Sequence, residues 1–258
     1  MRIFEGKYSN LCYIMLDEGL PVETHWQAMR DVPQNKTVEL HDFTWRYNMP
    51  KTFVDADIEI NPTRPWAEDH FQERVSRIPH NPPPSAAYWA KKGVDEHRDE
   101  QGRFSHTYPE RFWPKHANFV ESEPHWGIRY PYGDLDDVVS LLAREPYTRQ
   151  SYLPVWFPED TGAVPGERVP CTLGYHFILR GGQLHCFYPI RSCDLLRHFR
   201  NDVYMAVRLT QWILEELKKQ SRNSTFDWHG VTPGILTMHM VSLHVFEADI
   251  PVLEHKYA

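Results

Sequence analysis

Residues 202–219 constrain the fold of this chain more than any other segment. Side chains recur there at helical spacing on one face, at Val203, Val207, Thr210, Leu214 and Leu217. Ala206, Leu209 and Ile213 lie beside them and widen the apolar stripe. A stripe of this width is typical of a helix that other elements cover on most sides. The pattern therefore predicts one long, buried central helix.

The segments around this helix predict a sheet that packs against it. Strands are expected at 151–157, 172–179, 184–190 and 235–246. Gly181-Gly182 separates the second and third of these and favours a tight hairpin turn. Residues 136–144 have helical spacing, with acidic residues in the first turn. We therefore expect an α+β fold in which a mixed, partly antiparallel sheet packs on one long central helix.

The length fits one large domain, and we expect residues 1–258 to form a single unit. Within it, residues 76–125 are rich in loop formers and carry the run Asn81-Pro82-Pro83-Pro84. Loops of this length are usually functional lids or partly disordered segments. We interpret 76–125 as a divergent, loop-rich insertion.

Composition excludes several classes of function. The net charge is −7 and charges of both signs are mixed along the chain, which argues against a nucleic-acid backbone binder. No apolar run approaches the ~20 residues of a membrane span, and the first ten residues do not resemble a signal peptide. The four cysteines form no CxxC pair, so neither a metal site nor a disulfide framework is indicated. A soluble, cytoplasmic protein is the expectation.

Cys171 is the candidate nucleophile, in the segment Val169-Pro170-Cys171-Thr172. A thiol becomes an effective nucleophile when nearby positive charge or a helix N-terminus raises its thiolate fraction. The alternative is that Cys171 is a small buried hydrophobic residue. Cys186 and Cys193 fit that alternative better.

Arg191-Ser192, twenty residues after Cys171, is a candidate anion clamp. Arginine presents a planar fork of donors to a phosphate, and serine adds a hydroxyl donor. The alternative is an arginine at a strand end in an ordinary surface ion pair.

The order and spacing of these residues resemble the thymidylate synthase family, whose members carry Pro-Cys-His, a hairpin, and then Arg-Ser-x-Asp at the same separation. The matching residues here are Pro170-Cys171 and Arg191-Ser192-Cys193-Asp194. Residues 144–149 resemble the family's Asp-Ser-Arg-Arg segment, and Leu243-His244-Val245-Phe246 resembles its His-x-Tyr. The resemblance covers roughly residues 127–250 and fades toward the N-terminus.

The resemblance implies a role for each matching residue. Cys171 would add to C6 of a pyrimidine nucleoside monophosphate, and C5 would then attack the one-carbon unit of 5,10-methylenetetrahydrofolate. Arg191 and Ser192 would hold the 5′-phosphate, and the positive charge would also favour the Cys171 thiolate. Arg149 would reach the same phosphate from a partner subunit, since the family forms homodimers with shared active sites.

Three further assignments follow from the same resemblance. Asp194 would face the folate pterin, and His244 would lie near the sugar. A glutamate early in the family's chain organises water and proton transfers at the base. Glu68 is the choice here and Glu73 the second choice, while the alternative makes Glu68 a glutamate on a helix surface.

Asp202 is the informative departure from the family pattern. Thymidylate synthase has an asparagine at the matching position, which can donate and accept toward uracil. An ionised carboxylate only accepts, which suits the N4 amine of cytosine and repels O4 of uracil. Deoxycytidylate and cytidylate 5-hydroxymethylases carry this aspartate. The alternative makes Asp202 the N-cap of the long helix, before Val203.

Other departures leave parts of the chemistry open. Thr172 replaces the family histidine, Gln150 a second phosphate arginine, and Phe246 a tyrosine near the sugar. Trp126-Gly127 is expected at the position of a Tyr-Gly whose tyrosine assists removal of the C5 proton. Ribose and deoxyribose, and reduction or hydration of the transferred carbon, therefore stay open.

The leading hypothesis is a pyrimidine nucleotide C5 hydroxymethyltransferase that converts dCMP or CMP to its 5-hydroxymethyl form. The alternatives are C5 methylation of dCMP, a dUMP methylase or hydroxymethylase, and a catalytically inactive nucleotide-binding regulatory protein. A third interpretation, independent of the resemblance, is a soluble α+β domain with a loop face rich in Trp and Pro. Cytosine hydroxymethylation would be typical of bacteriophage DNA modification.

Overall fold

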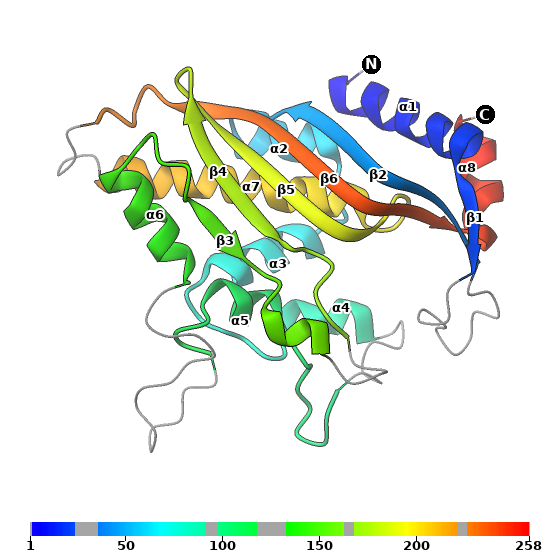
Figure 1. Cartoon of the computed structure of the whole chain (residues 1–258), viewed down its shortest axis with the longest axis horizontal. Helices are drawn as coiled ribbons and strands as arrows, with labels where there is room; N and C mark the ends of the chain where they lie inside the picture. The colour runs from blue at the N-terminus through cyan, green and yellow to red at the C-terminus, as the bar shows by residue number, and fades with distance from the viewer. Residues whose placement is uncertain are drawn as a thin grey trace.

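The structure is a computed structural model, and it describes residues 2–23, 36–90, 98–117, 133–162, 168–220 and 226–257. Its centre is a six-stranded sheet in the order β1-β2-β6-β5-β4-β3 (Figure 1). The strands are β1 (Leu20–Glu23), β2 (Lys36–Asn48), β3 (Tyr152–Pro154), β4 (Gly174–Arg180), β5 (Gln183–Asp194) and β6 (Thr232–Phe246). The pair β5–β6 is parallel and the other pairs are antiparallel. The predicted α+β class is confirmed.

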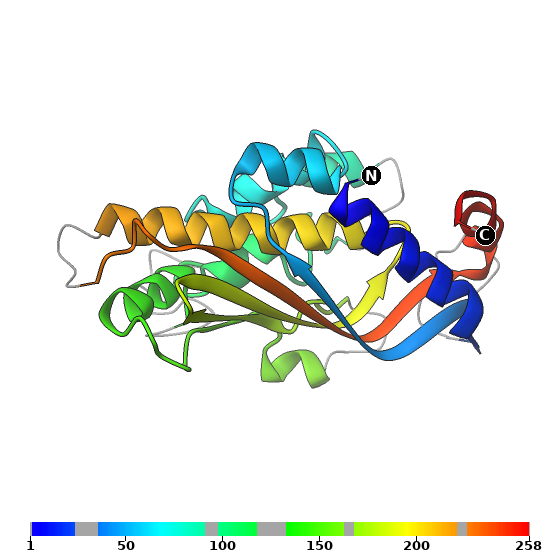
Figure 2. The same cartoon turned by 90° about the horizontal axis from the view of Figure 1, so that it is seen from above.

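The helix α7 (Phe199–Gln220) is the predicted central helix, and it lies along one face of the sheet (Figure 2). It buries the whole predicted stripe, from Val203 to Leu217. The other helices are α1 (Ile3–Glu18), α2 (Phe53–Ile60), α3 (Trp66–Val75), α4 (Ala87–Ala90), α5 (Tyr108–Phe112), α6 (Leu135–Arg144) and α8 (Ile250–Tyr257). Three short 3-10 turns, η1 (Pro84–Ala86), η3 (Pro158–Gly162) and η5 (Glu247–Asp249), complete the described elements.

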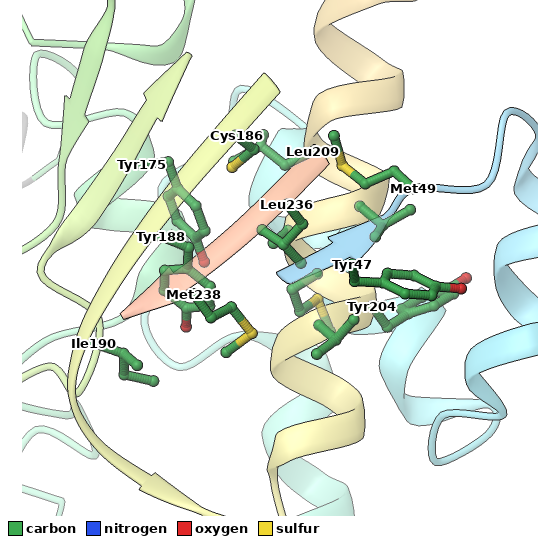
Figure 3. Close-up of a cluster of buried hydrophobic side chains, with 14 of the residues drawn as sticks. Tyr47, Met49, Tyr175, Cys186, Tyr188, Ile190, Tyr204, Leu209, Leu236 and Met238 are labelled. Carbon is green, nitrogen blue, oxygen red and sulfur yellow. The ribbon is translucent and has the colours of Figure 1, made fainter. Parts of the chain in front are cut away.

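The core between the sheet and α7 is unusually aromatic (Figure 3). Tyr175 of β4 and Tyr188 of β5 are fully buried and stack with ring centroids 4.6 Å apart. Leu209 of α7 and Met238 of β6 pack in the same cluster. Because side chains alternate along a strand, these inward residues fix which strand residues face away from α7.

The hairpin turn at Gly181-Gly182 and the helix α6 (Leu135–Arg144) confirm two predictions made from the sequence. Gly181 and Gly182 both adopt positive φ, at 56° and 71°, in the turn that joins β4 to β5. The strand predicted at 151–157 is shorter, since β3 covers only Tyr152–Pro154. The backbone N–H groups of Val155 and Trp156 both bond to the Leu173 carbonyl, and Pro158 then begins η3. Because both N–H groups share one acceptor, the regular ladder between β3 and β4 stops at the pair Pro154–Gly174.

The described parts of 76–125 form short helices joined by irregular chain. Helix α5 begins with a capping box between Thr107 and Glu110. The Asn81 side chain bonds to both backbone polar groups of Phe104 and to the Glu110 carboxylate. These bonds hold α5 against the end of α3, where the site described below lies. No helix among the described residues is long and apolar enough to cross a bilayer.

Candidate active site

Cys171 lies in the loop before β4, and Arg191 of β5 holds this loop in place. The Arg191 backbone N–H donates to the Cys171 carbonyl at 2.9 Å. The Arg191 guanidinium donates from Nε to the Pro170 carbonyl at 2.8 Å and from Nη2 to the Val169 carbonyl at 3.1 Å. The same Nη2 is 4.0 Å from the Cys171 Sγ. The predicted partners are therefore brought together, with the cation facing the thiol.

Burial outweighs this cation in setting the protonation of the thiol. Burial raises the pKa of Cys171, the Arg191 and Arg168 charges lower it, and the Asp202 charge raises it, with a net rise. As expected, the positive charge of Arg191 lowers the pKa of the thiol and so favours the thiolate. Burial raises this pKa by more, so the Arg191 charge is not the dominant effect. The thiol is therefore protonated at neutral pH in the free protein.

Asp202 lies in the first turn of α7, and the N-cap interpretation is wrong. The helix begins at Phe199, and the Asp202 N–H donates to the His198 carbonyl at 2.9 Å. Asp194 instead orders the turn before the helix, because its Oδ1 accepts from the backbone N–H groups of Leu196 and Arg197. The Asp202 side chain is consequently available for another task.

The Asp202 carboxyl faces the interior near the cysteines. The Cys193 thiol donates to its Oδ2 at 3.6 Å. Burial raises the pKa of Asp202 to about 7, while the Arg74 charge and the Cys193 hydrogen bond oppose this rise and Asp194 adds to it. Burial raises the pKa of both Cys171 and Tyr108, and the negative charge of Asp202 adds to each rise. Asp202 and Cys171 are therefore close enough to influence each other electrostatically, and both side chains are half-buried.

Tyr108 is a site residue that the sequence analysis missed. Its hydroxyl bonds to Thr172 Oγ1 at 3.0 Å, and Thr172 Oγ1 bonds to the Tyr188 hydroxyl at 2.8 Å. Thr172, which replaces the family histidine, thus joins two tyrosines directly beside Cys171. Trp126-Gly127, the expected position of the tyrosine, lies outside the described residues. The signal that could have found Tyr108 is the Thr107 and Glu110 capping box, which predicts a helix starting there.

The two candidate glutamates have different surroundings. Glu68 accepts hydrogen bonds from Tyr204 at 2.6 Å and from Arg208 at 3.0 and 3.2 Å, so it links α3 to α7. Glu73 accepts from the Ser85 backbone and side chain and lies 3.4 Å from the His70 Nδ1. The His70 ring is in turn edge-on to Tyr108, with centroids 6.2 Å apart. Only Glu73 is thus connected, through His70, to a residue beside Cys171.

Asp194 and His244 lie side by side where β5 and β6 pair. Both are buried, at about 5% exposure, and burial lowers the pKa of His244 while Asp194 and Glu39 oppose this. Asp194 Oδ2 is buried without a hydrogen-bond partner, although Arg197 lies 3.7 Å away. A buried carboxylate oxygen with spare acceptor capacity fits the N–H donors of a pterin ring.

Arg149 and Gln150 lie in an exposed stretch before β3, where the Arg149 carbonyl accepts from His176 Nε2 at 3.0 Å. Ser192 is half-buried on β5, beside Arg191. The Arg191 guanidinium lies 5.6 Å from the Trp156 ring centroid. No cluster of His, Cys, Asp and Glu suited to a metal ion occurs among the described residues.

The chain is similar to several proteins named as thymidylate synthases. No family model matches the chain. The chain is 21% identical over 187 residues to a protein of Methanosarcina barkeri named "Putative thymidylate synthase", covering 70% of this chain and 71% of the relative. A protein of Methanothermobacter thermautotrophicus with the same name is 21% identical over 216 residues, covering 81% and 84%. A third, from Methanosarcina mazei, is 25% identical over 126 residues, covering 48% and 52%.

Among solved structures, thermostable thymidylate synthase A from Bacillus subtilis superposes with a TM-score of 0.65 at 16% identity, covering 98% of this chain and 83% of that one. The chain therefore has the thymidylate synthase fold. The curated relatives and the superposed structure all carry the name thymidylate synthase, so the chain is similar to proteins of that name.

Proposed function

We propose that this protein is an enzyme that transfers a one-carbon unit to C5 of a cytidine monophosphate and releases the 5-hydroxymethyl nucleotide. The observation that carries the proposal is that the Cys171 thiol faces the Arg191 guanidinium while the Asp202 carboxyl is close enough to raise the pKa of that thiol. The similarity to thymidylate synthases supports the reaction class, and Asp202 supports the base.

In this proposal the Cys171 sulfur adds to C6 of the pyrimidine as the C5=C6 double bond opens, which makes C5 nucleophilic. After the one-carbon unit has been transferred, water adds to the exocyclic carbon and supplies the hydroxyl group, and loss of the thiol from C6 restores the double bond. The phosphate binds to Arg191 and Ser192, and the thiol loses its proton as the site fills. Tyr108, hydrogen-bonded to Thr172 beside the nucleophile, assists removal of the C5 proton, which leaves to solvent water. Asp202 accepts a hydrogen bond from the N4 amine of cytosine.

The cofactor in this proposal is 5,10-methylenetetrahydrofolate, which supplies the one-carbon unit when bound. Asp194 would hold the pterin through its unpartnered Oδ2, and His244 would lie on the sugar side of the site. The chemistry of these two groups fits a ring that carries N–H donors.

We also propose that the active form is a homodimer in which the partner subunit contributes Arg149 to the phosphate. Tyr152, His176 and Phe187 are aligned across β3, β4 and β5 in one row that faces away from α7. Tyr152 and Phe187 are each 41% exposed, and Val241 of β6, on the same face, is 49% exposed. Exposed aromatic and aliphatic side chains on a sheet face are typical of a surface that a second subunit covers.

The test is product analysis by mass spectrometry after incubation with methylenetetrahydrofolate and dCMP, CMP or dUMP in parallel. A 5-hydroxymethyl product from dCMP or CMP supports the proposal, provided that Cys171→Ala abolishes it. A methyl product together with dihydrofolate would instead make the protein a methylase, and products from dUMP alone would make it a uridylate enzyme. Nucleotide binding without any product, unchanged in Cys171→Ala, would make it a regulatory binding protein.

A further inference from the structure

Arg74 is a buried cation in the last turn of α3. The residue is only 5% exposed, and its Nε is buried without a hydrogen-bond partner. Among the described residues, no carboxylate lies within 4.0 Å of its guanidinium. A buried guanidinium that pairs with no carboxylate is destabilising, so such a group is usually retained for a ligand.

The guanidinium is held beside the nucleophile by Tyr108. Its Cζ lies 3.8 Å from the Tyr108 ring centroid, and the Tyr108 hydroxyl bonds to Thr172, the neighbour of Cys171. The Arg74 backbone carbonyl accepts from Trp113 Nε1 at 2.7 Å, which anchors this end of α3. Arg74 and Asp202 influence each other electrostatically but form no ion pair. Arg74 therefore lies over Tyr108, whose hydroxyl is one hydrogen bond away from the loop that carries Cys171.

We propose that Arg74 and Asp202 together recognise the Watson–Crick edge of cytosine, Arg74 donating to N3 and O2 while Asp202 accepts from the N4 amine. This inference rests on the proposed function, because it names a second specificity-determining residue of the same site. Cytosine presents a donor at N4 and acceptors at N3 and O2, which complement one acceptor and one fork of donors. Uracil presents an acceptor at position 4 and a donor at N3, and therefore mismatches both side chains.

A purely structural role for Arg74 is the competing interpretation, since a guanidinium over an aromatic ring is itself stabilising. Arg77 provides a matched control, two residues beyond the end of α3. Its guanidinium lies 5.7 and 5.5 Å from the Trp113 and Trp212 ring centroids. Unlike Arg74, it is half-exposed and paired with Asp136 and Glu216.

The experiment compares wild type with Arg74→Met, Arg74→Lys and Arg77→Met. Methionine keeps an unbranched apolar stem over Tyr108 and removes every donor, and lysine restores a single charged donor. The readouts are equilibrium binding of CMP, dCMP, UMP and dUMP by calorimetry, and tritium release from the 5-tritiated nucleotides. Thermal unfolding of each variant establishes that it is folded, and the lysine variant carries the test if the methionine variant is not.

We expect Arg74→Met to weaken cytidylate binding by about 10- to 100-fold and to lower the cytidylate-to-uridylate ratio by a similar factor. Arg74→Lys should recover part of the ratio, and Arg77→Met should leave it unchanged. If Arg74→Met weakened the binding of cytidylates and uridylates equally, or left the cytidylate-to-uridylate ratio unchanged, the inference would be overturned while the proposed function stands. Preferential cytidylate binding that depends on Arg74, without tritium release, would support the inference and remove the proposed function. A wild type without base preference would overturn both.

Discussion

Replacement of Asp202 by Asn tests whether this carboxyl is held in an unfavourable environment for a functional reason. Asparagine has nearly the same shape, so packing is preserved while the ionisable group is removed. Burial raises the pKa of Asp202 from 3.8 to about 7 in the folded protein. The folded state therefore binds more protons than the unfolded state between about pH 4 and pH 7, and its stability falls as the pH rises through this window.

The magnitude follows from the difference between these pKa values. It corresponds to at most about 4 kcal/mol of unfolding free energy, and to less in practice because the side chain is partly solvent-accessible. This loss is absent below about pH 4, is complete above about pH 7, and disappears in Asp202→Asn. The variant should therefore gain stability relative to wild type as the pH rises.

Urea unfolding of both proteins at a series of pH values from about 4 to 8 measures this difference. The account predicts that the stability difference between variant and wild type grows through the window and then levels off. A difference that is constant with pH would refute the reasoning, because it would mean that the Asp202 pKa is ordinary. The same variant should lose cytidylate preference and accept uridylate, since the asparagine amide can donate to O4.

Three further changes test other parts of the account. Glu68→Gln should lower the unfolding free energy by about 1–3 kcal/mol, because Arg208 is buried and loses its carboxylate partner. Its turnover should stay within about threefold of wild type. A Glu73→Gln variant assayed beside it should lose more turnover than stability. Tyr108→Phe should lower tritium release by about 100-fold with nucleotide binding preserved, and an unchanged rate would remove Tyr108 from the proton transfer. Mixed dimers of Cys171→Ala with Arg149→Gln should recover activity that neither variant has alone, because one site in the hybrid contains both native residues; no recovery at any mixing ratio would contradict a shared site.

The fold could be predicted because local signals and burial agree along most of the second half of the chain. The stripe from Val203 to Leu217 and the Gly181-Gly182 turn each allow one structure, and both were found as expected. The strand at 151–157 was overestimated, since the ladder ends at Pro154 although the hydrophobic residues continue to Phe157. The long strand β2 was not predicted.

The candidate site could be predicted only where it follows the hairpin. Cys171 and Arg191 are brought together by β4 and β5, whose register fixes which residues meet. Arg74 and Tyr108 come from α3 and α5, and their positions depend on how the loop-rich segment folds back over the sheet. Spacing along the chain does not encode that packing, so both residues were missed.

The central claim is that Cys171 activates C5 of a cytosine nucleotide that Asp202 selects. Tritium release from 5-tritiated dCMP, CMP and dUMP, with and without methylenetetrahydrofolate, tests it most directly in wild type and Cys171→Ala. The account predicts release from dCMP or CMP, no release from dUMP, and no release from any nucleotide in Cys171→Ala. Release from dUMP alone, or release that persists without the Cys171 thiol, would contradict it.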